Sequence, residues 1–134
     1  MVIIYILLIL ALYIIQIFLE PCLRYITGGK RQMMYGMGAR DKTVEMSVIG
    51  GRLKRAVENL KEALPIFLSL ALLAEMKGAA DGLTETGAVV FIIARVLYIP
   101  AYVINIGPLR SIVWTVAIVG MVLMLVGMWP SLGL

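Results

Sequence analysis

Residues 52–73 read RLKRAVENLKEALPIFLSLALL, and this segment changes character halfway. Its first half mixes charged and apolar residues, whereas the run from residue 63 onward is apolar. At about 100° per residue, a helix would place several polar side chains on one stripe: Arg52, Arg55, Asn59 and Glu62, with Glu58 at the border. Ionisable groups at the mouth of a membrane-spanning helix are costly, so they are paired or line a polar cavity. The segment therefore predicts a polar site at one face of a membrane.

The composition indicates an integral membrane protein. Of the 134 residues, 62% are apolar and 15% are charged, against about 25% charged in soluble domains. A membrane-spanning helix needs about 20 mostly apolar residues. We therefore expect an all-α bundle of four transmembrane helices in a single domain, residues 1–134, with spans at about 2–20, 52–75, 84–104 and 109–129. The first span lacks a positive start and a small-residue cleavage site, so we expect a retained helix and not a signal peptide.

Basic residues are unevenly distributed along the chain. Residues 24–55 hold eight Lys and Arg, whereas residues 75–85 hold one Lys and three acids. Because Lys and Arg are enriched in cytoplasmic loops, we expect the first connection and the turn near Pro108 on the cytoplasmic side, with both termini outside. This asymmetry accounts for the basic character, so we expect no nucleic-acid partner. Cys22 is the one cysteine and there is no histidine, which argues against a disulfide or a Cys/His metal cluster.

Local signals place the helix ends. Pro21 is expected to end the first helix at Glu20–Pro21 or soon after, and Thr27-Gly28-Gly29-Lys30 predicts a turn. Residues 33–51 are predicted as a loop at the membrane surface, with room for one helical turn. We expect the second helix to begin near Gly51 and the fourth at about Leu109. The third helix should begin near Thr84-Glu85-Thr86, which offers capping groups, and should kink at Pro100.

Arg95 is about mid-span in the third helix, and that helix offers no acid within its apolar core. An arginine at such depth costs about 3 kcal/mol on insertion scales. We therefore predict that Arg95 pairs with Glu62 or Glu58 across a helix interface. Whether such a pair locks the helices together or contacts a ligand stays open. Tyr98 and Tyr102 follow on the same stripe.

Arg110 and Ser111 open the fourth helix. A helix start offers free amide groups and a partial positive charge, so this position predicts an anion or thiolate site. The alternative is that Arg110 anchors the helix at lipid head groups. The second and fourth helices are expected to run away from the cytoplasm and the third toward it. This topology brings all these polar groups near one membrane face.

Two motifs resemble the MAPEG superfamily, the membrane-associated proteins in eicosanoid and glutathione metabolism, and the chain is similar to its short bacterial-type members. The first is the pattern Arg-Ala-x-x-Asn-x-x-Glu at residues 55–62. The second is ARVLYIPAY at residues 94–102, followed by PLRS at residues 108–111. A weaker one is GARD at residues 38–41.

The resemblance implies a homotrimer with sites between neighbouring subunits near the cytoplasmic face, in a bacterial inner membrane. It implies that Arg110 stabilises the thiolate of bound glutathione and that Asn59 and Glu62 bind its peptide part. Further candidate binding residues are Arg52, Arg55, Arg95, Tyr98, Tyr102 and Ser111. The chain departs from the pattern at Glu58, where prostaglandin synthase members place a basic glutathione contact, and at Tyr98, where they have a histidine.

These observations favour a glutathione-dependent transferase or peroxidase that acts on lipophilic electrophiles reaching it from membrane lipid. The alternative is a non-catalytic or lipid-binding MAPEG-like protein without glutathione activity, in which the polar cluster serves assembly alone. A proton-coupled exporter would need a carboxylate well inside a span, and the apolar cores of the third and fourth helices hold none.

Overall fold

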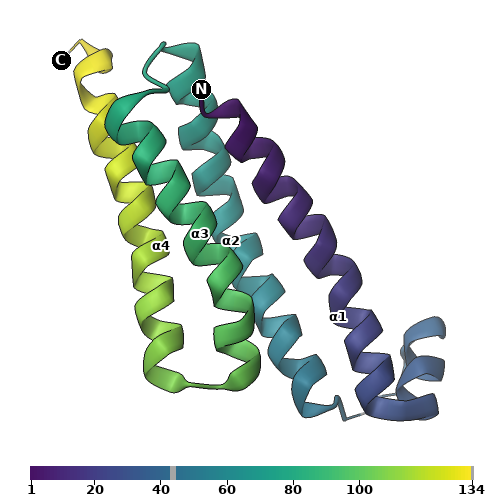
Figure 1. Ribbon diagram of the computed structural model, residues 1–134. Helices are drawn as coiled ribbons and strands as arrows, with labels where there is room; N and C mark the ends of the chain where they lie inside the picture. The colour runs from purple at the N-terminus through teal and green to yellow at the C-terminus, as the bar shows by residue number, and fades with distance from the viewer. Residues whose placement is uncertain (43–44, 134) are drawn as a thin grey trace.

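The computed structural model describes residues 1–42 and 45–133, and it is helical without strands over those residues (Figure 1). The all-α fold expected from the sequence is confirmed. Four α-helices are followed by a short 3-10 helix, in the order α1 Ile3–Met37, α2 Val48–Met76, α3 Gly82–Ile104, α4 Gly107–Met128 and 3-10 helix Trp129–Leu132. Figure 1 shows both termini and the α2–α3 turn at one end, with the α1–α2 and α3–α4 connections at the other.

Three helices are long and apolar enough to cross a membrane: α1, α3, and α4 together with the 3-10 helix. Within the described residues α2 does not qualify, because its first half carries charged residues. The span predicted at residues 52–75 therefore stays a prediction. In the bundle, α2 packs lengthwise between α1 and α3 (Figure 1).

The first helix does not end at Pro21, contrary to the sequence prediction. It continues to Met37 with one break at Gly29, where φ is 74° and ψ is −173°. Gln16 and Arg24, on either side of Pro21, are both buried, so packing holds the helix together across the proline. The turn predicted at residues 27–30 is confirmed, but the loop expected from residue 33 is helical as far as Met37. Residues 43 and 44 of that loop lie outside the described part of the chain.

A side-chain cap starts α2, which the sequence analysis did not predict, but none starts α3, where capping was expected. The Ser47 hydroxyl accepts a hydrogen bond from the Gly50 amide at 3.1 Å, so α2 begins at Val48, slightly before the predicted start. Asp81 is the N-cap of α3 and makes no side-chain cap bond. Thr84 is fully buried next to Gly127 of α4, so its side chain is used for packing and not for capping. The α3 helix continues through Pro100 to Ile104, and the kink expected there remains a prediction.

The core is built where α3 meets its neighbours. Phe67 of α2 stacks on Phe91 of α3 with ring centroids 4.4 Å apart, and both are fully buried. On the other side of α3, a Cβ added at Gly120 of α4 would lie 2.8 Å from the carbonyl oxygen of Gly87. The α3–α4 hairpin is therefore packed backbone against backbone, and this close approach fixes where the polar residues of α3 lie relative to those of α4, while the Phe67–Phe91 stack places α2 against α3.

Candidate functional site

Arg95 of α3 is 2% exposed and lies at the centre of the polar site. Its Nη1 donates a hydrogen bond to Asn59 Oδ1 of α2 at 2.7 Å, and its guanidinium lies 5.4 Å from the ring centroids of Phe91 and Tyr98. The predicted ion pair with Glu62 or Glu58 is wrong. Asn59 is the member of the α2 stripe that contacts Arg95.

Neither carboxylate forms an ion pair with Arg95. Glu58 is exposed and forms an ion pair with Lys54 at 3.9 Å, one helical turn earlier. Glu62 is also exposed and forms no ion pair within the described residues, although it lines one small cavity together with Arg95. A neutral amide at Asn59 provides an acceptor without the cost of burying a second charge.

Arg52 and Arg55 tie the start of α2 to the end of α3. Arg52 Nη1 donates to the carbonyl oxygen of Val103 at 2.8 Å, which is one of the last carbonyls of α3 and lacks a partner within the helix. Arg55 Nε donates to the hydroxyl of Tyr102 at 3.1 Å. These contacts fix the angle at which the polar half of α2 meets α3.

Tyr102 also positions Arg110, the candidate thiolate-stabilising residue. The Arg110 guanidinium lies 5.0 Å from the Tyr102 ring centroid, a cation–π arrangement. Tyr98 packs on Tyr102 with centroids 5.5 Å apart. The half-buried guanidinium of Arg110 therefore rests on an aromatic platform that Arg55 holds in place from the α2 side.

Three cavities follow one another between α2 and α4. The first, of about 460 Å³, is polar and is lined by Asn59, Tyr98, Tyr102, Arg110, Ser111, Trp114 and Thr115. The second, of about 130 Å³, shares Asn59 and Trp114 with the first and adds Glu62 and Arg95. The third, of about 370 Å³, shares three residues with the second and is wholly apolar, lined by Ile66, Leu70, Ile118, Met121, Val122 and Leu125. We call this series the α2–α4 groove.

The groove brings together seven of the nine predicted site residues. Arg55 stands behind the groove and contacts Tyr102 in its wall, whereas Arg52 contacts Val103, which lies outside it. The sequence reasoning missed Trp114 and the apolar residues of α4. Trp114 and Ile118 follow Arg110 at four and eight residues, so the helical period counted from Arg110 could have placed both on the same face.

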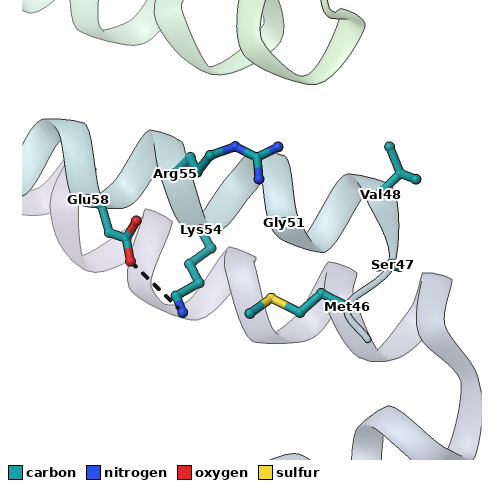
Figure 2. Close-up of a pocket in the computed structure, with 7 residues that line it drawn as sticks. All are labelled: Met46, Ser47, Val48, Gly51, Lys54, Arg55 and Glu58. Atoms are coloured by element: carbon teal, nitrogen blue, oxygen red, sulfur yellow. Dashed lines mark ion pairs between the residues drawn. The ribbon is translucent and has the colours of Figure 1, made fainter. Parts of the chain in front are cut away.

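A separate cavity of about 530 Å³ lies at the start of α2 and is lined by Met46, Ser47, Val48, Gly51, Lys54, Arg55 and Glu58. Figure 2 shows the Lys54–Glu58 pair on one side of α2 and the Arg55 side chain on the other. Of the predicted site residues, only Arg55 lines this cavity. Although it is the larger space, the groove gathers the polar groups of three helices and is the better candidate site.

The MAPEG family profile matches residues 2–128 of the chain. Comparison with curated proteins and comparison with solved structures gave no match. The family match includes all four helices and every residue of the α2–α4 groove. Together with three helices able to span a membrane, it makes this chain an integral membrane protein that belongs to the MAPEG family, the family of membrane-associated proteins in eicosanoid and glutathione metabolism.

Proposed function

We propose that the protein is a glutathione-dependent transferase or peroxidase whose second substrate is a lipophilic electrophile. One observation carries this proposal. The Arg110 guanidinium lies at the polar end of a groove whose other end is lined by aliphatic and Met side chains alone. In such a groove, the thiol of glutathione would bind next to the Arg110 guanidinium, and an apolar electrophile would bind toward the aliphatic end.

The electrostatics at Arg110 favour a thiolate. A free thiol has a pKa of about 8.5, so roughly a tenth or less is ionised at neutral pH. A nearby fixed positive charge favours the charged form. Arg110 lies in the first turn of α4, where backbone amides without helical partners add a partial positive charge. When bound, glutathione would supply the nucleophilic sulfur, and Arg110 would hold it as thiolate.

The remaining groups fit a zwitterionic tripeptide with two carboxylates and one ammonium group. Arg95 and Arg110 are cationic, Glu62 is anionic, and Asn59 and Ser111 carry neutral polar side chains. The departure at Glu58 does not place a repelling charge in this space. Glu58 lines the separate cavity and is paired with Lys54.

We further propose a homotrimer in a bacterial inner membrane, with the α1–α2 and α3–α4 connections on the cytoplasmic side. The α2–α4 groove supports this assembly, because Glu62, Ser111 and Trp114 in its wall are exposed in the single chain. A neighbouring subunit covering the groove would enclose the polar site and separate it from bulk water. The basic residues of the first connection support the orientation.

Conjugation of glutathione to a chlorinated aromatic electrophile by the purified protein tests the activity. We expect turnover in the wild type and a loss of roughly 100-fold in kcat/KM for Arg110→Leu, the scale of losing one transition-state charge contact. Lys77→Gln, at the opposite end of the bundle, is the control and should leave the rate unchanged.

Thermal unfolding with and without glutathione separates the two candidate functions. If glutathione raises the Tm but no conjugate forms, the chain binds the tripeptide without this catalysis. If neither effect is seen, the enzyme proposal fails and the non-catalytic alternative stands.

A further inference from the structure

The segment after the Gly29 break, residues 30–42, has a surface that the proposed function does not use. We call it the hook. At Gly29 the φ of 74° is a left-handed conformation that glycine adopts without strain, and the helical part of the hook returns alongside the end of α1 (Figure 1). Gly36 lies directly against the Tyr25 ring of α1, so a side chain at this position would collide with it. The hook is therefore packed against α1.

The inward side of the hook is tied to the start of α2 by polar contacts. Gln32 is 95% buried and donates from Nε2 to the carbonyl oxygen of Glu45. Just before the hook, the Thr27 hydroxyl lies 2.7 Å from that of Ser47, which caps α2. The orientation of the hook is thereby coupled to α2, the helix that carries Asn59.

The outward side combines cations with apolar side chains. Four basic residues are exposed, and none of them forms an ion pair within the described chain: Lys30, Arg31, Arg40 and Lys42. Asp41 is the one acid between residues 30 and 42. Three methionines are also exposed, Met33 at 45%, Met34 at 71% and Met37 at 75%. Such a surface is unfavourable in water and suits a boundary between anionic groups and hydrocarbon.

We propose that the hook binds the anionic lipid surface of the leaflet on its own side of the membrane. The four cations contact lipid phosphates, and the three methionines reach the upper part of the acyl chains. Clusters of four or more Lys and Arg directly beside a membrane-spanning helix bind anionic lipids in this way. The partner is a lipid head group with its attached chains, and the interaction does not depend on glutathione chemistry.

Reconstitution in nanodiscs tests the lipid preference. Competition between phosphatidylglycerol and phosphatidylcholine for the protein measures this preference. The wild type should bind phosphatidylglycerol more tightly, and a higher salt concentration should weaken the preference. Replacing Lys30, Arg31, Arg40 and Lys42 with Gln should lower the preference at least about tenfold, since each cation near the surface contributes about fivefold. The control is Lys61→Gln with Lys77→Gln, which removes two cations outside the hook. An unchanged preference in the fourfold variant would overturn the proposal.

Inorganic phosphate separates a lipid surface from a simple anion site. At matched ionic strength, phosphate should not displace phosphatidylglycerol more strongly than chloride does. Selective displacement by phosphate would show a free-anion site and would refute the lipid proposal.

A second test measures how deeply the hook lies in the membrane, and it leaves the four basic residues in place. Cys22→Ser leaves a chain without cysteine, into which Met34→Cys or Lys77→Cys places a single nitroxide label. We expect the nitroxide at residue 34 to collide more often with oxygen, which concentrates in the membrane, than with a water-soluble nickel complex. The nitroxide at residue 77, in the α2–α3 turn, should collide more often with the nickel complex. An aqueous environment at residue 34 in a folded sample, checked by far-UV circular dichroism, would show that the hook does not enter the membrane.

Discussion

The hydrogen bond between Arg95 and Asn59 can be measured by a double-mutant cycle. Arg95→Met keeps most of the apolar stem of the side chain and removes the charge, whereas Asn59→Leu removes the acceptor at similar volume. The bond joins Nη1 and Oδ1 at 2.7 Å, and Arg95 is 2% exposed. If the bond stabilises the fold, the double variant should lose less stability than the sum of the two single variants.

Two reference values bracket the size of the effect. Hydrogen bonds between membrane helices average about 0.6 kcal/mol in such cycles, with a maximum near 1.7, because separated helices find other partners in the lipid. Hydrogen bonds to charged groups contribute about 1.5–3 kcal/mol. The Arg95 guanidinium is buried without a carboxylate partner. Once the Asn59 side chain is lost, it keeps only the longer bond from Nη2 to the backbone carbonyl oxygen of residue 59, at 3.5 Å. We therefore expect a coupling free energy of about 1.5 kcal/mol and a cost of about 3 kcal/mol for Asn59→Leu alone.

Unfolding by SDS in mixed micelles, followed by far-UV circular dichroism, gives the four free energies. The matched control is the Lys54–Glu58 pair on the same helix, which is exposed and 3.9 Å apart. Exposed pairs of this kind contribute roughly 0–0.5 kcal/mol, so Lys54→Met and Glu58→Leu should be additive. If the costs of Arg95→Met and Asn59→Leu are additive as well, the two side chains do not depend on each other and the hydrogen bond does not stabilise the fold.

Three further predictions address packing and the site. Gln16 is buried, and its Oε1 atom has no hydrogen-bond partner in the described structure. Gln16→Leu should therefore leave the free energy of unfolding unchanged or raise it by about 1 kcal/mol. A decrease of more than about 1 kcal/mol would show that the Gln16 side chain does have a hydrogen-bond partner. Gly120→Ala places a methyl group 2.8 Å from two backbone atoms of α3 and should cost about 1–3 kcal/mol, whereas Gly107→Ala, with open space around it, should cost less than about 1 kcal/mol. Tyr102→Phe keeps the ring beneath the guanidinium and loses only the hydroxyl, so kcat should stay within a few-fold of wild type; Tyr102→Leu removes the ring and should lower kcat without raising KM in proportion. Equal kcat values for the two Tyr102 variants would show that the aromatic platform does not position the cation.

The helices and the polar stripe could be predicted from the sequence because they follow from local periodicity. Apolar runs of the right length gave α1, α3 and α4, and a spacing of three and four residues placed Arg55, Asn59 and Glu62 on one side of α2. The structure brings Asn59 and Glu62 to the groove, with Arg55 directly behind it. The proposed roles of these residues rest on the resemblance to the family and remain to be tested.

The partner of Arg95 could not be predicted, because residue counting does not fix the height at which two helices cross. Asn59 and Glu62 are three residues apart, about 4.5 Å along the helix axis. A shift of that size decides between an amide and a carboxylate as the partner. That height depends on contacts such as the Phe67–Phe91 stack between α2 and α3, which joins residues distant in sequence. The same limit applies to Pro21, where tertiary packing keeps a helix that local rules would end.

The charged first half of α2 and the polar residues of α3 and α4 depend on one another. The charged residues of that half keep α2 from qualifying as a membrane span. Yet its side chains make the contacts that α3 needs in this environment: Asn59 for Arg95, Arg55 for the Tyr102 hydroxyl, and Arg52 for a terminal carbonyl. An apolar α2 would be easier to insert but would leave a buried guanidinium without its side-chain acceptor, and burying a poorly compensated charge costs several kcal/mol. At the polar site, side chains of α2 thus provide the hydrogen-bond partners that water would otherwise provide to the polar groups of α3. The groove begins there and becomes apolar toward the opposite end of α2, and the cavity between its apolar end and Arg110 is lined by both apolar residues and the polar residues Asn59, Glu62 and Arg95.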